Sequence, residues 1–211
     1  MTDYKFLFPA FGPGRWADLG EAILQEDLVR PTMAHVASMF HDIFFDYGQL
    51  PTNFKEFASK LKKVAGLWAY TGTLNVPSKG VYVQDYPEVK NGRPSMTESE
   101  LVKKLKEHDK NVRFVSLGFK TGFMSPSELS KNPYIKALAG EEGAERLAKV
   151  ASKTKLGAYK LASFVAPPAI DQTQSLTGIC SVISFLGVDL WLNTRFMDNK
   201  YSSYYAIAVE R

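Results

Sequence analysis

The sequence predicts an α+β protein, and three observations lead to that fold class. Apolar residues recur at helical spacing over much of residues 15–66 and again after Thr97. Short runs rich in β-branched and aromatic residues stand between these helical stretches. The chain has 211 residues, 45% of them hydrophobic, which is ample for a sizeable core. This composition excludes disordered, collagen-like, coiled-coil and disulfide-stapled proteins.

A short strand and three helices are expected first. Tyr4, Phe6 and Phe8 alternate with other residues, as in a strand with one aromatic face, and the glycines of 12–14 break that strand. Pro31 stops the first helix, and Gly48 closes the second. The three helices are expected over residues 15–30, 33–47 and 53–66.

A hairpin and a fourth helix come next. Residues 67–76 and 81–86 have strand composition, and the turn residues 77–80 join them. Overlapping capping patterns, Ser95 with Glu98 and Thr97 with Glu100, precede the helix. A strand over residues 112–119 follows.

The last third begins with helices and ends β-rich. Ser125, Pro126 and Glu128 have the spacing of a capped helix start, and Pro133 interrupts the helical stretch, which runs to about residue 153. Residues 198–200 are the expected tip of the last hairpin. The expected strands cover residues 156–166, 178–186, 188–197 and 201–209.

Read in order, residues 1–119 give a βαββαβ succession if residues 15–66 form one enlarged helical crossover. That succession predicts a ferredoxin-like sheet, followed by a C-terminal antiparallel β layer. We expect a single domain over residues 1–211. Its three sub-regions are an α+β core at 1–119, a helical part at 120–155 and a β-rich part at 156–211.

Several features bear on the compartment. Cys180 has no second cysteine with which to form an internal disulfide, and its apolar strand setting favours a buried, inert thiol. The first residues lack the pattern of a signal peptide. The longest apolar-rich run, 179–192, is too short and too polar for a span of about 20 residues. We therefore expect no membrane contact, and a location in the cytoplasm, a virus particle or another intracellular assembly.

Positive charge is concentrated in the middle of the chain. Residues 51–165 hold 20 Lys and Arg against 11 Asp and Glu, a net charge of +9, whereas the two ends together carry −5. Such a centre attracts phosphate backbones or acidic proteins. The other interpretation is that these lysines are solvated faces of amphipathic helices.

The strand at 81–86 suggests where a nucleic acid would bind. Lys79 and Gly80 followed by Tyr86 weakly echo the RNP1 pattern of RNA-binding sheets. In a ferredoxin-like sheet this strand would be central, so that its aromatics would either stack on bases or pack as core. The Gly-rich stretch 117–124 is a candidate binding loop. The predicted nucleic-acid-binding residues are Lys79, Tyr82, Arg93, Arg113 and Lys120.

Two weaker site signals lie near the N-terminus. Residues 12–17 formally fit G-x-G-x-x-G/A, but Pro13 removes an N–H donor and no second parallel strand follows, which favours a plain strand-to-helix turn. On the second helix His35, Asp42 and Asp46 share a polar face. His35 lies about 10 Å from Asp42 along the axis, too far for one metal ion, and His41 lies off that face. No metal ligand set or cofactor is therefore assigned.

Nucleophile elbows, P-loops, H-E-x-x-H and C-x-x-C motifs are absent from the sequence, which argues against an enzyme. The leading prediction is a non-enzymatic subunit of a larger assembly that binds nucleic acid through its basic centre and contacts other protein subunits. One alternative is a structural protein that uses β-edges and a Tyr-rich surface around Tyr201, Tyr204, Tyr205 and Trp191. The other is a small enzyme centred on His35, Asp42 and Asp46.

Overall fold

The computed structural model describes residues 5–153, 155–156, 159–160, 163–165, 176–185, 189–196 and 204–210. The helices are α1 (Trp16–Gln25), α2 (Met33–Phe45), the 3₁₀ helix η1 (Tyr47–Gln49), α3 (Thr52–Val64), α4 (Glu98–Lys106), α5 (Pro126–Lys131) and α6 (Pro133–Lys153). The strands are β1 (Phe11–Gly14), β2 (Ala65–Val76), β3 (Gly80–Asp85), β4 (Glu88–Lys90), β5 (Arg93–Ser95), β6 (Val112–Ser116), β7 (Gly122–Met124), β8 (Lys155–Leu156), β9 (Tyr159–Lys160), β10 (Ser163–Val165), β11 (Leu176–Phe185), β12 (Asp189–Phe196) and β13 (Tyr204–Ala206).

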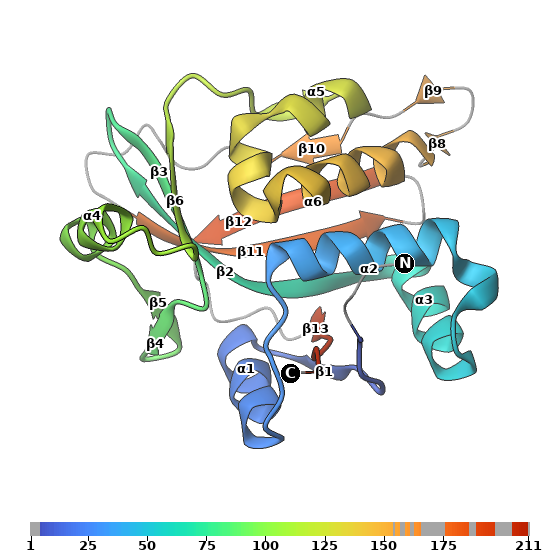
Figure 1. Ribbon diagram of the computed structural model, residues 1–211. Helices are drawn as coiled ribbons and strands as arrows, with labels where there is room; N and C mark the ends of the chain where they lie inside the picture. Colours follow the sequence, from blue (N-terminus) through green and yellow to red (C-terminus); the bar gives the residue numbers. More distant parts are fainter. Residues whose placement is uncertain are drawn as a thin grey trace.

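One mixed sheet joins most of the described strands, in the order β1-β13-β2-β11-β12-β10-β7, with β3 and β6 added beside β2. The central strand, β2, has 12 residues and therefore has room for two partners along one edge. Its Leu67 pairs with β13, and its residues from Thr71 to Val76 pair with β3. The opposite edge pairs with β11 from Ala65 to Asn75. The sheet thus branches at β2, which runs beside β11 through the middle of the molecule (Figure 1).

Helices α2 and α6 lie next to each other over one face of the sheet (Figure 1). The apolar residues of these helices form the largest core cluster together with Leu67 and Ala69 of β2 and Val81 and Val83 of β3. The N-terminus of α2 is fixed to the same face, because the amide of Met33 donates to the Thr71 hydroxyl, 3.0 Å away.

Helix α1 packs against the opposite face of β2. Alternation along the strand turns Trp68 and Tyr70 away from α2 and into a second cluster with Trp16 of α1. The Trp16 indole donates to the Ala69 carbonyl at 3.1 Å, and the Tyr70 hydroxyl donates to the Trp16 carbonyl at 2.8 Å. These bonds satisfy the polar ends of two buried aromatic side chains.

Helix α4 covers the far end of β2 and the adjoining β3. Leu74 and Val76 of β2, Tyr82 of β3 and Leu101 of α4 belong to a third buried cluster. The predicted cap of this helix is confirmed, since the Thr97 side chain accepts from the Glu100 amide. A single strand therefore contributes to three separate parts of the core.

The α+β class is confirmed, and so are several local predictions. The hairpin of β2 and β3 forms as expected, with Gly80 at φ 153° where a Cβ would meet the Val115 carbonyl. The capping box before α5 is complete, because the Ser125 and Glu128 side chains each accept from the other residue's backbone amide. β11 and β12 pair antiparallel close to the expected ranges.

The ferredoxin-like order is wrong for the strands described. In that order the first strand would lie in the centre of the sheet, but β1 pairs with β13, and β6 pairs with β3. The physical reason lies in the aromatics near the N-terminus. Phe8 stacks on Phe54 of α3 with 4.2 Å between ring centroids, and the backbone of Phe6 forms an isolated bridge to Val209 outside the named strands.

The C-terminal strands do not form a separate layer, because β11 inserts beside β2 in the main sheet. The glycines at 12–14 do not break a strand: residues 11–14 are β1. The Gly14 carbonyl accepts from the Trp68 indole at 3.1 Å, and a Cβ on Gly14 would lie 2.8 Å from Leu19. This segment is packed against side chains, which does not fit a phosphate loop. The predicted hairpin tip at 198–200 lies outside the described residues.

Candidate functional site

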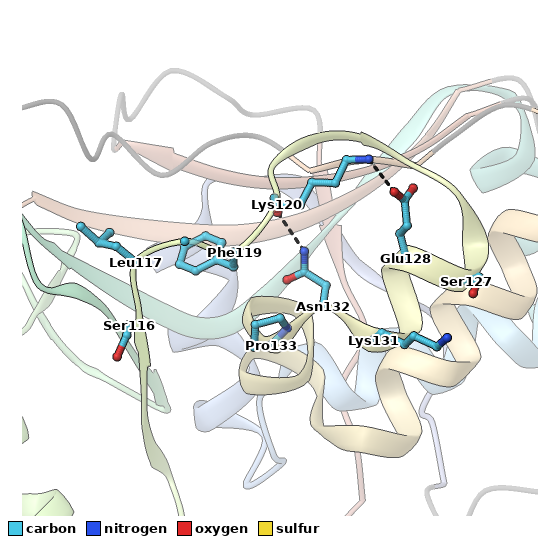
Figure 2. A pocket seen from close by; sticks show the side chains of 10 residues that line it. Ser116, Leu117, Phe119, Lys120, Ser127, Glu128, Lys131, Asn132 and Pro133 are labelled. Atoms are coloured by element: carbon cyan, nitrogen blue, oxygen red, sulfur yellow. Dashed lines mark hydrogen bonds and ion pairs between the residues drawn. The ribbon is translucent and has the colours of Figure 1, made fainter.

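A pocket of about 560 Å³ lies between the loop that follows β6 and the helices α5 and α6 (Figure 2). The loop contributes residues 116–120 and the helical side contributes residues 127–128 and 131–133. The lining therefore includes part of the predicted Gly-rich binding loop together with residues of α5 and the start of α6. Gly118 has φ 102°, a left-handed conformation that lets the loop turn between Leu117 and Phe119.

Asn132 holds together the two segments that form this pocket. It is 4% exposed, and its side-chain oxygen accepts from the Tyr134 amide at 2.9 Å, which caps α6. Its side-chain nitrogen donates to the Lys120 carbonyl at 2.8 Å (Figure 2). Phe119 stacks on Tyr134 with 4.8 Å between ring centroids. One buried amide thus fixes both the helix start and the loop.

The best-defined charge contact in the pocket is an ion pair. The Lys120 ammonium lies 2.7 Å from a Glu128 carboxylate oxygen, and the two side chains are 51% and 48% exposed (Figure 2). The other carboxylate oxygen accepts from the amide and hydroxyl of Ser125. The Lys120 hydrogen bond and then the two Ser125 bonds lower the pKa of Glu128 to about 2. Glu128 therefore stays ionised over the neutral range.

Two more lysines stand at or beside the pocket. Lys131 of α5 lines it, is exposed, and has no ion-pair partner among the residues that the structure describes. The backbone of Lys79 is adjacent, because its carbonyl accepts from the Leu117 amide at 3.2 Å. The Lys79 ammonium lies 2.7 Å from Glu98, and that contact raises its pKa. The lining charges, Lys120, Lys131 and Glu128, leave one net positive charge.

The other predicted nucleic-acid residues lie elsewhere. Tyr82 is 5% exposed and packs on Phe114 under α4, which favours the core interpretation of that aromatic. Arg93 is exposed on the β4–β5 hairpin. Of the predicted residues Lys120 therefore lines the pocket and the backbone of Lys79 lies beside it, whereas Tyr82 and Arg93 lie outside it.

Arg113 belongs to a partly buried network. One guanidinium nitrogen lies 2.6 Å from an Asp85 oxygen, and another donates to the Ala137 carbonyl of α6 at 2.6 Å. The second Asp85 oxygen accepts from the Thr71 hydroxyl, also at 2.6 Å. Three bonds tie β2, β3 and β6 to α6, so this arginine has a structural role in the geometry shown.

Sequence reasoning missed Lys131 and Asn132. Lys131 resembles every other exposed helical lysine, and nothing in its spacing singles it out. Asn132 did carry a usable signal, because an Asn directly before Pro133 is a strong helix cap. A capped start next to the candidate loop would have indicated where that loop is anchored.

The predicted acidic and histidine group is composed differently from the expectation. His35 is buried, and its Nδ1 accepts from the Thr32 amide at 3.0 Å, so it caps α2. Burial lowers its pKa. His41, which was predicted to lie off the polar face, has its Nδ1 3.6 Å from Asp42. One possible metal-ligand atom from each of His41, Asp42 and Asp46 lies within 4.8 Å of the other two.

The Tyr-rich surface is only partly described. Tyr204 is 8% exposed and packs on Trp68, and Tyr205 meets the edge of Phe57. Tyr201 and the side chain of Trp191 lie outside what the structure describes. The two described tyrosines therefore contribute to packing rather than to an open surface.

Comparison with known proteins gives no further guide to function. No protein-family profile, no curated protein sequence and no solved structure matches this chain. Among the described helices, none combines the length and the apolar character needed to cross a membrane.

Proposed function

We propose that this chain is a non-enzymatic nucleic-acid-binding protein that takes phosphates of a single strand at the Lys120–Lys131 pocket. The supporting observation is that two lysines, one half exposed and one exposed, line the pocket. The side chains of Leu117 and Phe119 line it as well. Ammonium groups attract phosphates, and apolar or aromatic walls accept bases with little sequence preference.

In this proposal the Lys120 ammonium leaves Glu128 and binds a phosphate instead. Glu128 keeps its two bonds to Ser125 when the ammonium moves to a phosphate, so the helix cap remains intact. The ion pair is about half exposed, and exposed pairs contribute little to stability. The exchange therefore costs little.

Because the net charge of the pocket is small, we expect it to bind a nucleic acid weakly. Two lysines facing two phosphates of a single strand predict a slope of about −1.4 for the logarithm of affinity against the logarithm of salt concentration. Binding by this pocket alone is weak, which agrees with a subunit whose assembly supplies further contacts. Linking several weak contacts raises the overall affinity without new chemistry.

The test is fluorescence anisotropy of a labelled single-stranded RNA over a range of salt concentrations. The double variant Lys120→Gln with Lys131→Gln should bind about tenfold more weakly and lose most of its salt dependence. The matched control is Lys103→Gln with Lys106→Gln, which removes the same charge from α4. Equal loss in the two double variants would show general electrostatics rather than this pocket.

A second candidate function is protein contact along a sheet edge. β6 pairs only with β3 among the described strands, and Phe114 on it is 38% exposed. An unpaired edge with an exposed aromatic suits strand addition by a partner. Light scattering tests this candidate through self-association: Phe114→Lys should lower the mass of any oligomer, and an unchanged mass would count against the edge.

A further inference from the structure

A different pocket, of about 430 Å³, lies between α1 and the β4–β5 hairpin. Helix α1 contributes Asp18, Glu21 and Leu24, and the hairpin contributes Val89 and Gly92. Arg30 enters the pocket from the extended segment between α1 and α2. The volume falls in the range of about 300–1,000 Å³ that is usual for small-molecule sites. None of these residues lines the Lys120–Lys131 pocket, so the inference does not depend on the proposed function.

Arg30 is held in place by the backbone on both sides. The amide and carbonyl of Val29 exchange 3.0 Å hydrogen bonds with Val209, and the Pro31 carbonyl accepts from the Tyr70 amide. The guanidinium carbon lies 5.3 Å from the centre of the Tyr70 ring. That ring is fully buried and anchored through its hydroxyl, so it is a rigid support for the cation.

The Arg30 guanidinium lacks the partners that similar arginines have. Three described arginines are partly buried: Arg30, Arg113 and Arg146. Arg113 pairs with Asp85, and Arg146 bonds to Ser38 and Glu142. Within the described residues Arg30 interacts with the Tyr70 ring and electrostatically with Tyr86, but it has no hydrogen bond or carboxylate partner. Burial lowers its pKa, although a guanidinium remains charged in proteins. Its planar donors are suited to a carboxylate.

The same pocket also carries negative charge and an apolar surface. Glu21 is exposed and has no ion-pair partner in the described part of the chain, while Asp18 pairs with Arg15 at 2.7 Å. These carboxylates would repel a simple anion, and they would attract an ammonium group. Leu24 is 48% exposed, one turn beyond Glu21, and Val89 faces the pocket from the hairpin. The lining thus has a cationic, an anionic and an apolar part.

We propose that this pocket binds an α-amino acid with an aliphatic side chain. Arg30 takes the α-carboxylate, Glu21 takes the α-ammonium, and Leu24 with Val89 contacts the side chain. A zwitterion satisfies both charges at once, which neither a simple anion nor a simple cation does. The apolar part selects an aliphatic residue over glycine.

The test is isothermal titration of the full chain with L-leucine and three analogues. L-leucinamide lacks the carboxylate, 4-methylpentanoate lacks the ammonium, and glycine lacks the side chain. We expect leucine to bind, and each analogue to bind about tenfold more weakly or worse. Absence of heat with leucine at millimolar concentration would overturn the proposal. Tighter binding of 4-methylpentanoate than of leucine would do the same, because it would show a plain anion site.

Three variants locate the binding. Glu21→Gln should weaken leucine about tenfold while improving 4-methylpentanoate, an inversion that simple loss of fold does not produce. Glu26→Gln, the matched control at the C-cap of the same helix, should leave both affinities unchanged. Arg30→Lys keeps the charge and the stem over Tyr70 and should still weaken leucine about tenfold, because the planar fork is lost. Unchanged leucine affinity in both Glu21→Gln and Arg30→Lys would place the ligand elsewhere and overturn the assignment.

Discussion

Two ion pairs of nearly equal length differ in what surrounds them. Arg113 and Asp85 are 2.6 Å apart with side chains 29% and 15% exposed, whereas Lys120 and Glu128 are 2.7 Å apart and about half exposed. The first pair has further bonds to Thr71 and Ala137 on two other elements. In the second pair, within the part of the chain that the structure describes, only the glutamate side chain has another partner, the Ser125 residue of its own helix cap.

Distance alone therefore does not separate a structural ion pair from an exchangeable one. Removing one member of a buried pair leaves the other charge uncompensated in a poorly solvated place. Removing one member of an exposed pair leaves the other to water. Arg113 is therefore expected to act on stability, and Lys120 on binding.

The largest effect should come from Arg113→Ala. It removes the partner of Asp85 and the donor to the Ala137 carbonyl, and we expect the free energy of unfolding to fall by about 2–3 kcal/mol. Lys120→Gln should lower it clearly less than Arg113→Ala does, because its ion pair is about half exposed. Urea unfolding of the two variants measures both values.

A double variant tests whether the uncompensated charge of Asp85 causes the loss of stability in Arg113→Ala. Asp85→Asn combined with Arg113→Ala removes the orphaned charge, so its loss should be smaller than the sum of the two single losses. Additive losses would mean that the two side chains do not act as a pair. Equal losses for Arg113→Ala and Lys120→Gln would show that burial does not make the Arg113–Asp85 pair more stabilising than the Lys120–Glu128 pair.

An intermediate effect is expected at Asn132, which links the pocket to the core. Asn132→Ala removes the cap of α6 and the bond to the Lys120 carbonyl, and should lower the free energy of unfolding by about 1–2 kcal/mol. Asn132→Ser keeps an uncharged oxygen that caps the helix and loses the amide donor to the loop. Thermal unfolding should therefore show a smaller loss for the serine than for the alanine variant, and equal losses would show that the loop bond carries the effect.

These residues also show what could be predicted from the sequence. The capping box of Ser125 and Glu128 is a contact between residues three apart, so spacing alone revealed it. Arg113 and Lys120 looked alike because each is a basic residue in or beside a strand of the basic centre. What separates them is Asp85, 28 residues before Arg113, and no local pattern indicates that contact.

The strand order of the sheet could not be predicted for the same reason. β3 follows β2 through a short turn and was predicted, but the other long partner of β2 is β11, whose Ser181 pairs with Trp68. Pairing over such a separation depends on which strands bury their faces together, and several arrangements satisfy one pattern of hydrophobic residues. The candidate pocket could not be predicted for the same reason, because its loop and its helices come together only in the tertiary structure.

The smallest effect, and the sharpest test of the exposed pair, is the titration of Glu128. Its pKa is lowered from 4.5 to about 2, with the Lys120 hydrogen bond as the largest cause. Because the folded pKa is lowered, the stabilisation is complete above about pH 4.5 and is lost as the pH falls towards 2. Carboxyl-carbon NMR should find the midpoint near 2 in the wild type and distinctly higher in Lys120→Gln. Glu128→Gln should be less stable than the wild type at neutral pH, with the difference shrinking in acid. An identical midpoint with and without the Lys120 ammonium would mean that the two side chains do not interact in solution, and the pocket would then hold a lysine already available to phosphate.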